Sequence, residues 1–382
     1  MKVLAISYGK NFFELGNIER ERMVACANEV SELQVVVFSN IKEGFSKEVI
    51  NNNFIVEPTN SKNNFRKVID AIRIGKRIIN DSGNKNDWVI TAQDPFEAGL
   101  VAWQISRATG VPFNVQEHGD FFSTGHWASE SILNRFRAIF GKFILKKADG
   151  VRVVSKRIKK TLERLGVRTD KIAILSVRTD TTRFASATPK PSAIPNYDPN
   201  KKYILSVARF VPQKNLSLLI KSFHQVQKTI PEAHLMLVGQ GKEEQDLKTL
   251  AQKILPKDSY TFQPWSDDVP ALMAIAHVYA LSSNYEGWGR VLVEAAAAGL
   301  PIVTTEVGCA YEAIIVGPAC TVVAVNDEVS FAKALNEILL NTEVAASAAK
   351  VIKNKINTQA TTNEDYAKAW TEILERTRTS KL

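Results

Sequence analysis

Short apolar runs that favour β-strands alternate with amphipathic helical segments along most of this chain. In the first half, the candidate strands are residues 3–6, 35–38, 88–91, 113–116, 151–154 and 172–175. Between them lie segments such as 64–80, in which apolar residues recur at helical spacing. Strands that alternate with helices are typical of βαβ units, which build parallel sheets. The alternation therefore predicts an α/β protein.

The alternation stops once, at residues 185–200, which hold four of the 14 prolines. Proline fixes φ and favours extended backbone, so this segment is interpreted as a linker. The alternation then resumes, with candidate strands at 203–207, 235–238, 260–262, 278–281 and 302–304. A single core stops growing at about 250–300 residues. We therefore expect two doubly wound Rossmann-like domains, 1–185 and 201–360, a linker at 186–200, and a terminal helix within 361–382 that packs back on the first domain.

Composition excludes several classes of protein. Apolar residues make up 45% and charged residues 23%, which is globular rather than disordered or fibrous. Cys26, Cys309 and Cys320 are scattered and lack metal-ligand spacing, which argues against a disulfide framework or a zinc site and favours a reducing compartment. The start of the chain resembles a first strand rather than a signal peptide, and no apolar run is long enough to span a bilayer. We expect a cytoplasmic protein.

The net charge of +9 is concentrated in residues 131–160, which hold ten basic residues and one acidic residue. The ten are Arg135, Arg137, Lys142, Lys146, Lys147, Arg152, Lys156, Arg157, Lys159 and Lys160. One local basic segment indicates a local anionic partner rather than nucleic acid. Apolar residues recur at helical spacing from 132 to 144, so two interpretations remain: a packed helix with a solvated basic face, or a surface that docks on anionic lipid or an anionic acceptor.

Two cations follow the strand candidate at 203–207. Arg209 and Lys214 lie in the loop at its end, where a helix begins. Cations beside a helix N-terminus suit a diphosphate, because the charges and the helix dipole act together. The alternative is a pair of solvated surface cations.

A second motif, EGWGRVLVE, follows the strand candidate at 278–281. Gly287 and Gly289 allow the backbone to approach a ligand and to present N–H groups at a helix N-terminus. Glu286 and Glu294 are eight residues apart, and carboxylates are good acceptors for paired sugar hydroxyls. The alternative, a helix with two exposed acids, leaves the paired glycines unexplained.

The first domain offers two further candidates, a histidine and a glycine-containing loop. His118 follows a strand directly, beside Gly119, although a lone histidine is as often structural. The loop after the first strand carries Gly9 and Gly16 but does not match the G-x-G-x-x-G fingerprint, which disfavours a dinucleotide oxidoreductase. There is no Asp-x-Asp sequence, so a carboxylate clamp for Mg²⁺ or Mn²⁺ has no obvious ligands. We expect neither a metal nor another cofactor.

Together these motifs resemble the retaining glycosyltransferases of family 4, which have the GT-B fold. The resemblance covers most of the chain and is strongest at 203–315. The family's Arg-x4-Lys pair is Arg209 and Lys214, its strand-end Val-Gly-x-Gly is seen in LVGQG with Gly239, and its Glu-x7-Glu runs from Glu286 to Glu294. His118 stands where the family keeps a site histidine. The GT-B fold implies two Rossmann-like domains that face each other across a cleft.

The resemblance implies a role for each matched residue. Arg209 and Lys214 would hold the donor diphosphate, Glu286 would meet the sugar hydroxyls, and His118 would lie against the transferred sugar. Transfer in such enzymes is described as front-face, with the leaving phosphate accepting the proton of the acceptor. Glu294 would take the ribose hydroxyls. The full donor-binding set implied is Gly16, Gly239, Gly287, Trp288, Gly289, Arg290, Val291 and Glu294.

The sequence departs from the family pattern in three loops. Ser176–Asp180 replaces a Pro-Asn-Gly-Val-Asp turn, Cys309 replaces a glycine, and Pro264 replaces a glycine in a loop that commonly borders the base. The change at Pro264 leaves the identity of the base less constrained.

The resulting prediction is a retaining hexosyltransferase that uses a nucleotide-sugar, with UDP favoured over GDP. Its acceptor would be a glycan or a lipid-linked molecule in cell-envelope polysaccharide or glycolipid synthesis. If residues 131–160 dock on an anionic membrane, the protein is peripheral on the inner face of that membrane. The alternatives are a related enzyme on a soluble acceptor, of the disaccharide or glucan synthase type, and a nucleotide-sugar-binding protein without catalysis.

Overall fold

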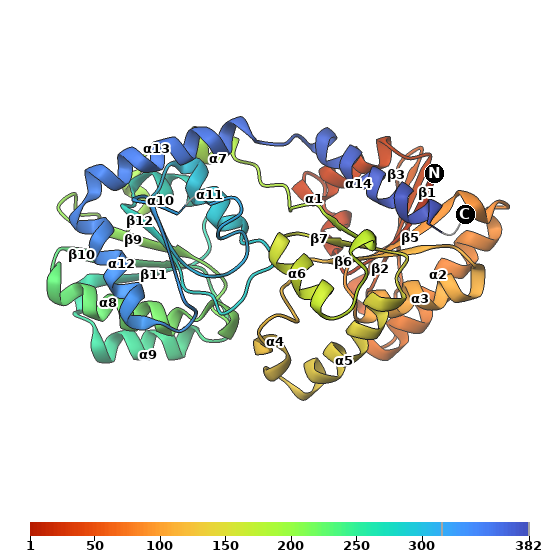
Figure 1. Cartoon of the computed structure of the whole chain (residues 1–382), viewed down its shortest axis with the longest axis horizontal. Helices are drawn as coiled ribbons and strands as arrows, with labels where there is room; N and C mark the ends of the chain where they lie inside the picture. Colours follow the sequence, from red (N-terminus) through yellow and green to blue (C-terminus); the bar gives the residue numbers. More distant parts are fainter. Residues whose placement is uncertain (315, 381–382) are drawn as a thin grey trace. The chain divides into compact units, whose positions relative to one another are not determined.

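The computed structural model describes residues 1–314 and 316–380, and the chain divides into two compact units. The first unit comprises residues 1–178 and the C-terminal segment from Thr361, and the second comprises Thr179–Ala360. Each unit is built on a sheet of mainly parallel strands with helices packed against it (Figure 1). The predicted α/β class with two Rossmann-like sheets is confirmed.

The sheet of the first unit has the strand order β3-β4-β2-β1-β5-β6-β7-β8. Its strands are β1 (Lys2–Ser7), β2 (Glu32–Val37), β3 (Glu48–Asn51), β4 (Phe54–Pro58), β5 (Trp88–Ala92), β6 (Phe113–Glu117), β7 (Gly150–Val153) and β8 (Ile172–Ile174). Neighbouring strands are parallel except β3 and β4, which are antiparallel. The winding reverses between β1 and β5, and such reversals are where open parallel sheets bind ligands.

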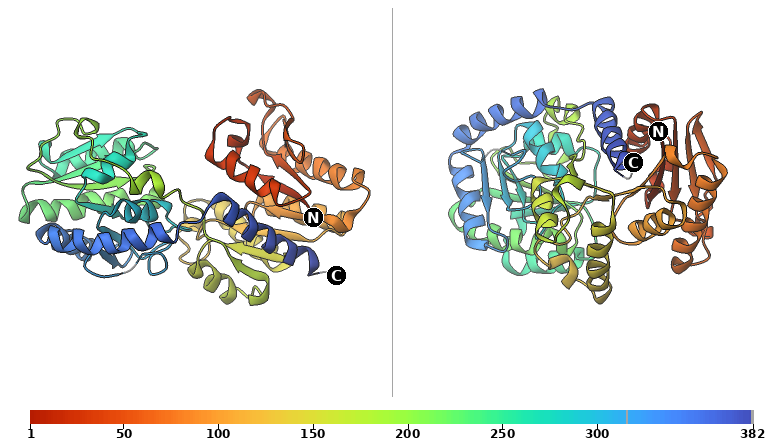
Figure 2. Two further views of the ribbon diagram at one scale, coloured as in Figure 1. Left: turned by 90° about the horizontal axis from the view of Figure 1, so that it is seen from above. Right: turned by 45° about the vertical axis from the view of Figure 1, so that its right-hand side comes forward.

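The helices of the first unit include one that returns from the end of the chain. They are α1 (Ile18–Asn28), α2 (Asn64–Asp81), α3 (Glu97–Thr109), α4 (His126–Ser129), α5 (Ile132–Lys147), α6 (Lys156–Arg164) and α14 (Asn363–Thr379). Figures 1 and 2 show α14 beside α1. Tyr366, Trp370 and Leu374 of α14 are buried in one core cluster with residues of β1 and β2. The apolar face of α14 is thus part of the core of the first unit.

The sheet of the second unit is parallel throughout, in the order β11-β10-β9-β12-β13-β14. The strands are β9 (Lys202–Val207), β10 (Ala233–Val238), β11 (Tyr260–Gln263), β12 (Val278–Leu281), β13 (Ile302–Thr305) and β14 (Cys320–Val323). The helices are α7 (Thr182–Ala185), α8 (Leu216–Thr229), α9 (Glu244–Ile254), α10 (Val269–Ile275), α11 (Arg290–Ala298), α12 (Glu328–Leu340) and α13 (Thr342–Thr358). Here the winding reverses between β9 and β12.

The sequence did not predict three of the strands, and the predicted linker is packed against the second unit. The strands β3, β4 and β14 lie at or next to sheet edges and have only four, five and four residues, so each carries little of an apolar pattern. Residues 186–200 do not run free, because Ala193 and Ile194 are buried in the core of the second unit. Gln263 Nε2 also donates to Ala193 O at 3.1 Å. The units divide at residue 178, seven residues before the predicted end of the first domain.

Candidate functional site

The predicted donor residues of the second unit gather where the winding of its sheet reverses. Arg209 and Lys214 follow β9, and Glu286 follows β12, its neighbour in the sheet. Both loops leave the carboxyl ends of their strands, so they lie side by side at one edge. The sheet topology thus brings together residues more than 70 positions apart in sequence.

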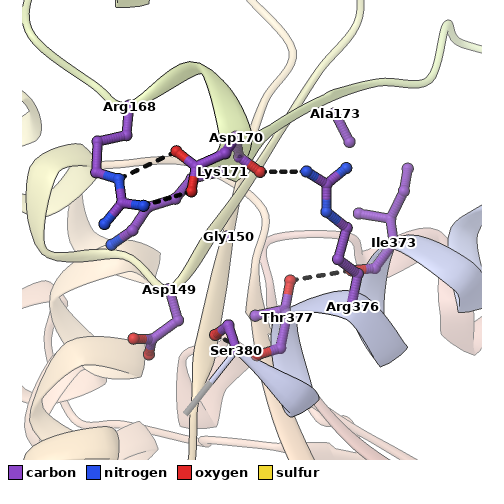
Figure 3. Close-up of a pocket in the computed structure, with 10 residues that line it drawn as sticks. All are labelled: Asp149, Gly150, Arg168, Asp170, Lys171, Ala173, Ile373, Arg376, Thr377 and Ser380. Carbon is purple, nitrogen blue, oxygen red and sulfur yellow. Dashed lines mark hydrogen bonds and ion pairs between the residues drawn. The ribbon is translucent and has the colours of Figure 1, made fainter.

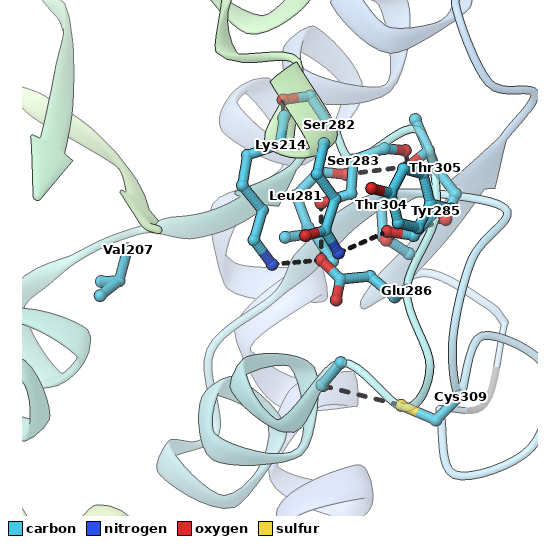
Figure 4. A network of polar contacts seen from close by, with 12 residues as sticks. Val207, Lys214, Leu281, Ser282, Ser283, Tyr285, Glu286, Thr304, Thr305 and Cys309 are labelled. Carbon is cyan, nitrogen blue, oxygen red and sulfur yellow. Dashed lines mark hydrogen bonds and ion pairs between the residues drawn. The ribbon is translucent and has the colours of Figure 1, made fainter. Parts of the chain in front are cut away.

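Lys214 and Glu286 form an ion pair at this edge (Figure 4). The Lys214 side chain is 13% exposed and that of Glu286 is 9% exposed, so the pair is largely shielded from water. Ser283 Oγ donates to the same carboxylate oxygen of Glu286 at 2.8 Å. A shielded charge pair needs such partners, because desolvation penalises both charges. The alternative of solvated surface cations is wrong for Lys214, whereas Arg209 is exposed.

A set of hydrogen bonds that the sequence did not indicate holds Lys214 in place. Lys214 is the last residue of a 3₁₀ turn, Pro212–Lys214. Gln213 Nε2 donates to Tyr285 O at 3.0 Å, and Asn284 Nδ2 donates to Pro212 O at 3.0 Å. These reciprocal amide contacts join the two loops on either side of the pair. No local pattern predicts them, because each contact spans more than 70 residues.

The glycines of the second unit allow close backbone approach. Gly239, after β10, has a φ of 143°, and a Cβ there would lie 1.9 Å from Ala208 O. Gly241 is similar, because its Cβ would lie 2.3 Å from Phe210 O. The loop after β10 therefore lies against the backbone on both sides of Arg209, and only glycine fits at these positions.

The motif after β12 forms the N-terminus of α11. Gly289 is its N-cap, with a φ of 79°, and Trp288 is half-buried beside it. Cys309 N donates to Trp288 O at 2.7 Å, so this loop is attached to the segment after β13. The first N–H groups of a helix have no intrahelical partners and attract anions. Arg290 and Val291 are the first two residues of α11, and Gly287 is buried in the loop before it.

Glu294 lies inside α11 and is also largely shielded. Its side chain is 17% exposed and pairs with Arg290 at 3.8 Å. Burial raises the pKa of Glu294, and Arg290 opposes that rise. Burial raises the pKa of the Tyr279 hydroxyl, and the negative charges of Glu294 and Glu286 raise it further. The exposed-acid interpretation is therefore wrong for both carboxylates. Sequence reasoning missed Tyr279, the buried tyrosine whose hydroxyl both of them influence.

The other two predicted residues lie in the first unit. His118 follows β6 directly, is half-buried, and has its Nε2 3.2 Å from Gln116 Oε1. Gly16 has a φ of 75° and precedes Asn17, the N-cap of α1. No atom lies within 4 Å of where a Cβ would stand at Gly16, so this glycine permits a left-handed turn rather than a close contact.

A cavity of about 420 Å³ in the first unit involves none of these residues (Figure 3). It lies between α14 and the amino ends of β7 and β8, and its lining includes Arg168, Asp170 and Arg376. Arg168 pairs with Asp170, and Arg376 donates to Asp170 O. Its cations are thus engaged within the protein, at the end of the sheet opposite His118.

Metal-ligating side chains do not cluster in the part of the chain that the structure describes. Among residues 1–314 and 316–380, no three His, Cys, Asp or Glu side chains are placed to hold one metal ion.

The fold of this chain is similar to that of solved structures over nearly its whole length. Sucrose-phosphate synthase from Thermosynechococcus elongatus matches with a TM-score of 0.80 at 19% identity, covering 98% of both chains. Anabaena Alr3699/HepE in complex with UDP and glucose matches with a TM-score of 0.73 at 18% identity, again covering 98% of each. The fold is therefore GT-B, the class of two-domain glycosyltransferases.

Sequence comparison places the chain within that class. The model of glycosyl transferases group 1 matches residues 189–358, and that of the glycosyl transferase 4-like domain matches residues 76–178. The chain belongs to the group 1 glycosyl transferases, of the family 4 type.

Two curated relatives match over parts of the chain. An uncharacterized glycosyltransferase of Haemophilus influenzae is 39% identical over 27% of this chain and 29% of its own. The lipopolysaccharide core biosynthesis glycosyltransferase LpsE of Rhizobium meliloti is 27% identical over 42% of this chain and 47% of its own. The chain thus spans less than half the length of these two relatives.

Proposed function

We propose that this protein is a retaining hexosyltransferase that binds its nucleotide-sugar donor at the loops after β9 and β12. The observation that carries the proposal is the shielded Lys214–Glu286 pair beside the N-terminus of α11. One partner suits a phosphate and the other a sugar hydroxyl. Their contact fits a ligand in which these two groups are covalently adjacent, as they are in a nucleotide-diphosphate sugar.

The donor would be held by groups of known position in the second unit. Lys214 and Arg209 would bind the diphosphate, and Gly239 would let that diphosphate approach the backbone. Glu286 would accept from the sugar hydroxyls. The N–H groups of Trp288, Gly289, Arg290 and Val291 would add donors from the start of α11.

The reaction would break the bond between the anomeric carbon and the diphosphate. Negative charge would build on the leaving oxygen, where the ammonium of Lys214 and the guanidinium of Arg209 stabilise it. The leaving phosphate would accept the proton of the acceptor hydroxyl, which then bonds to the same face of the sugar. In the first unit, His118 would contact the transferred sugar and the Gly16 loop would border the phosphates.

Similar proteins support the proposed nucleotide and acceptor. The HepE complex with UDP supports UDP over GDP, and Glu294 would accept from the ribose hydroxyls. LpsE supports a glycan or lipid-linked acceptor in cell-envelope polysaccharide or glycolipid synthesis. The alternative of a soluble acceptor is favoured by the likeness to sucrose-phosphate synthase. A binding protein without catalysis is disfavoured by the intact set of Arg209, Lys214, Glu286 and Glu294.

The test is a thermal-shift screen of UDP, GDP, UDP-glucose and GDP-mannose, followed by an assay of donor hydrolysis. A ligand at 100 times its Kd should stabilise the protein by about 2.7 kcal/mol. Stabilisation by UDP-glucose with slow release of glucose supports the enzyme. Stabilisation without any hydrolysis or transfer supports the binding protein, and no stabilisation by any of the four compounds contradicts a nucleotide-sugar site.

We also propose that α5 docks the protein on an anionic membrane from the cytoplasmic side. Ile132, Phe136, Ile139 and Phe143 form one stripe along this helix, at helical spacings of four and three, and are 73%, 66%, 70% and 40% exposed. Beside this apolar stripe runs a row of exposed cations, Arg135, Lys142 and Lys146. An exposed apolar stripe flanked by cations is typical of helices that lie in a membrane interface.

Two of the ten basic residues of 131–160 lie outside this exposed face. Arg152 is 1% exposed in β7, and Arg137 pairs with Glu97, so neither belongs to it. The helix contains no acidic residue, so a second copy of the chain would bring like charges together. In the described parts of the chain, no helix is both long and apolar enough to cross a membrane.

Vesicle co-sedimentation tests this docking. Replacing Arg135, Lys142 and Lys146 with Gln should weaken binding to phosphatidylglycerol vesicles on the order of 100-fold, since each charge contributes about 1 kcal/mol. Replacing Ile132, Phe136 and Ile139 with Ser should also release the protein. The matched control removes three exposed lysines of the second unit, Lys221, Lys228 and Lys257, and should bind normally. Equal binding to phosphatidylcholine vesicles, or equal loss in the control, would contradict the proposal.

A further inference from the structure

A buried arginine lies directly behind His118. Arg152 of β7 is 1% exposed, and no carboxylate forms an ion pair with it among the described residues. Its Nε and Nη2 donate to Leu175 O at 3.0 and 2.6 Å, and its Nη1 donates to Gln116 Oε1 at 2.8 Å. The guanidinium is therefore held by neutral acceptors, and its positive charge remains uncompensated next to the histidine.

These contacts fix the orientation of the Gln116 amide. A guanidinium can only donate, so the Gln116 atom that faces Arg152 must be the oxygen. The amide nitrogen then points the other way, where it donates to Thr91 Oγ1 at 2.9 Å. His118 Nε2 lies 3.2 Å from the same oxygen. Since Oε1 can only accept, Nε2 must carry a hydrogen.

We infer that Arg152 and Gln116 are positioning residues that hold His118 as the neutral tautomer with its proton on Nε2. The other ring nitrogen, Nδ1, is then an acceptor with a free lone pair. The tautomer itself does not depend on the proposed function, but its role does. A neutral acceptor nitrogen can accept a hydrogen bond from a hydroxyl of the transferred sugar. A charged imidazolium could only donate and would repel positive charge developing at the anomeric carbon.

The surroundings of His118 also favour its neutral form. Burial lowers the pKa of His118 well below its usual value, and Arg152 of β7 and Arg22 of α1 lower it further. The acids of its own loop are Glu117 and Asp120, and burial raises the pKa of both carboxyl groups. The histidine should therefore stay neutral across the pH range in which a free histidine titrates.

Helix α14 contributes a tyrosine that contacts Arg152. The ring of Tyr366 lies 5.5 Å from the guanidinium carbon of Arg152 and 5.5 Å from that of Arg22. The quadrupole of an aromatic ring attracts cations, so the Tyr366 ring stabilises both guanidinium groups. Helix α14 thus stabilises the guanidinium of Arg152, which in turn favours the neutral form of His118.

Imidazole proton–nitrogen correlation spectra of the free protein test the inference, with His118→Asn to assign the signal. We expect His118 to show a protonated Nε2 and an unprotonated Nδ1 at neutral pH. A proton on Nδ1, or a charged ring, would overturn it. The spectra require no substrate, so this outcome is independent of whether the protein transfers a sugar.

Two variants test whether Gln116 and Arg152 keep His118 neutral. In Gln116→Glu, which keeps the side-chain shape, a carboxylate replaces the amide, and the titration midpoint of His118 should rise by about 1–3 pH units. Arg152→Gln removes the cation and should raise the midpoint too, if that variant folds. The control is Leu374→Ala, which loses packing in the same core cluster but keeps Tyr366 and Arg152. It should lower thermal stability and leave the midpoint unchanged. An unchanged midpoint in Gln116→Glu would overturn the proposal.

Discussion

At the scale of single residues, the Lys214–Glu286 pair couples stability to catalysis. Lys214→Ala leaves Glu286 shielded, with Ser283 as its remaining donor. Breaking such a pair typically costs at least about 3 kcal/mol of unfolding free energy. If the ammonium also stabilises the leaving diphosphate, turnover should fall by about 10²–10³. Denaturant unfolding and donor hydrolysis measure the two losses, and near wild-type turnover would remove Lys214 from the mechanism.

The two losses can be separated. In the double variant Lys214→Met with Glu286→Gln no unpaired charge remains, so stability should largely return while turnover stays low. Lys221→Ala removes an exposed lysine of α8 and serves as the control, with both quantities expected near wild type. If the double variant stays as unstable as Lys214→Ala, the shielded charge is not what destabilises that variant.

At the scale of elements, the N-terminus of α11 depends on a glycine outside the helix. Gly308 has a φ of 56°, and a Cβ there would lie 2.4 Å from Trp288 O. Gly308→Ala should therefore displace the loop that presents the first N–H groups of α11, lowering turnover on the order of 10²-fold. Isothermal titration with UDP should show weaker binding as well.

A matched glycine separates backbone strain from this displacement. Gly83 has a φ of 79° with no atom within 4 Å of a Cβ. Gly83→Ala should cost about 1–2 kcal/mol of stability through strain alone. Its UDP affinity and turnover should match the wild type. Equal functional loss in both variants would show that the Trp288 contact is irrelevant.

At the scale of the whole molecule, the proposed reaction is carried by cations and helix N–H groups rather than by a carboxylate clamp. The chain has no Asp-x-Asp sequence, and its described acids form no ligand cluster. Donor hydrolysis should therefore persist at an unchanged rate in EDTA. Loss of activity that Mn²⁺ or Mg²⁺ restores would reveal a metal site built from residues that do not cluster in this conformation.

The sequence alone was sufficient for the class of fold and for the list of donor-site candidates. Strand and helix periodicities are local, so the repeated alternation predicted two parallel sheets, and Arg209, Lys214, Glu286 and Glu294 were each found within a short motif. Edge strands such as β3 and β14 were missed, because each has only four residues and therefore carries little of an apolar pattern.

Only the tertiary structure decided which side chains are buried and which groups they contact. It paired Lys214 with Glu286, buried Arg152 behind His118, and left the apolar stripe of α5 exposed. The sequence could not distinguish a buried arginine from a surface one, because the charge is the same and the difference lies in the neighbours. Those neighbours, Gln116 and Tyr366, come from other strands and helices, and which of them meet is set by the order of strands in the sheet and by the return of α14.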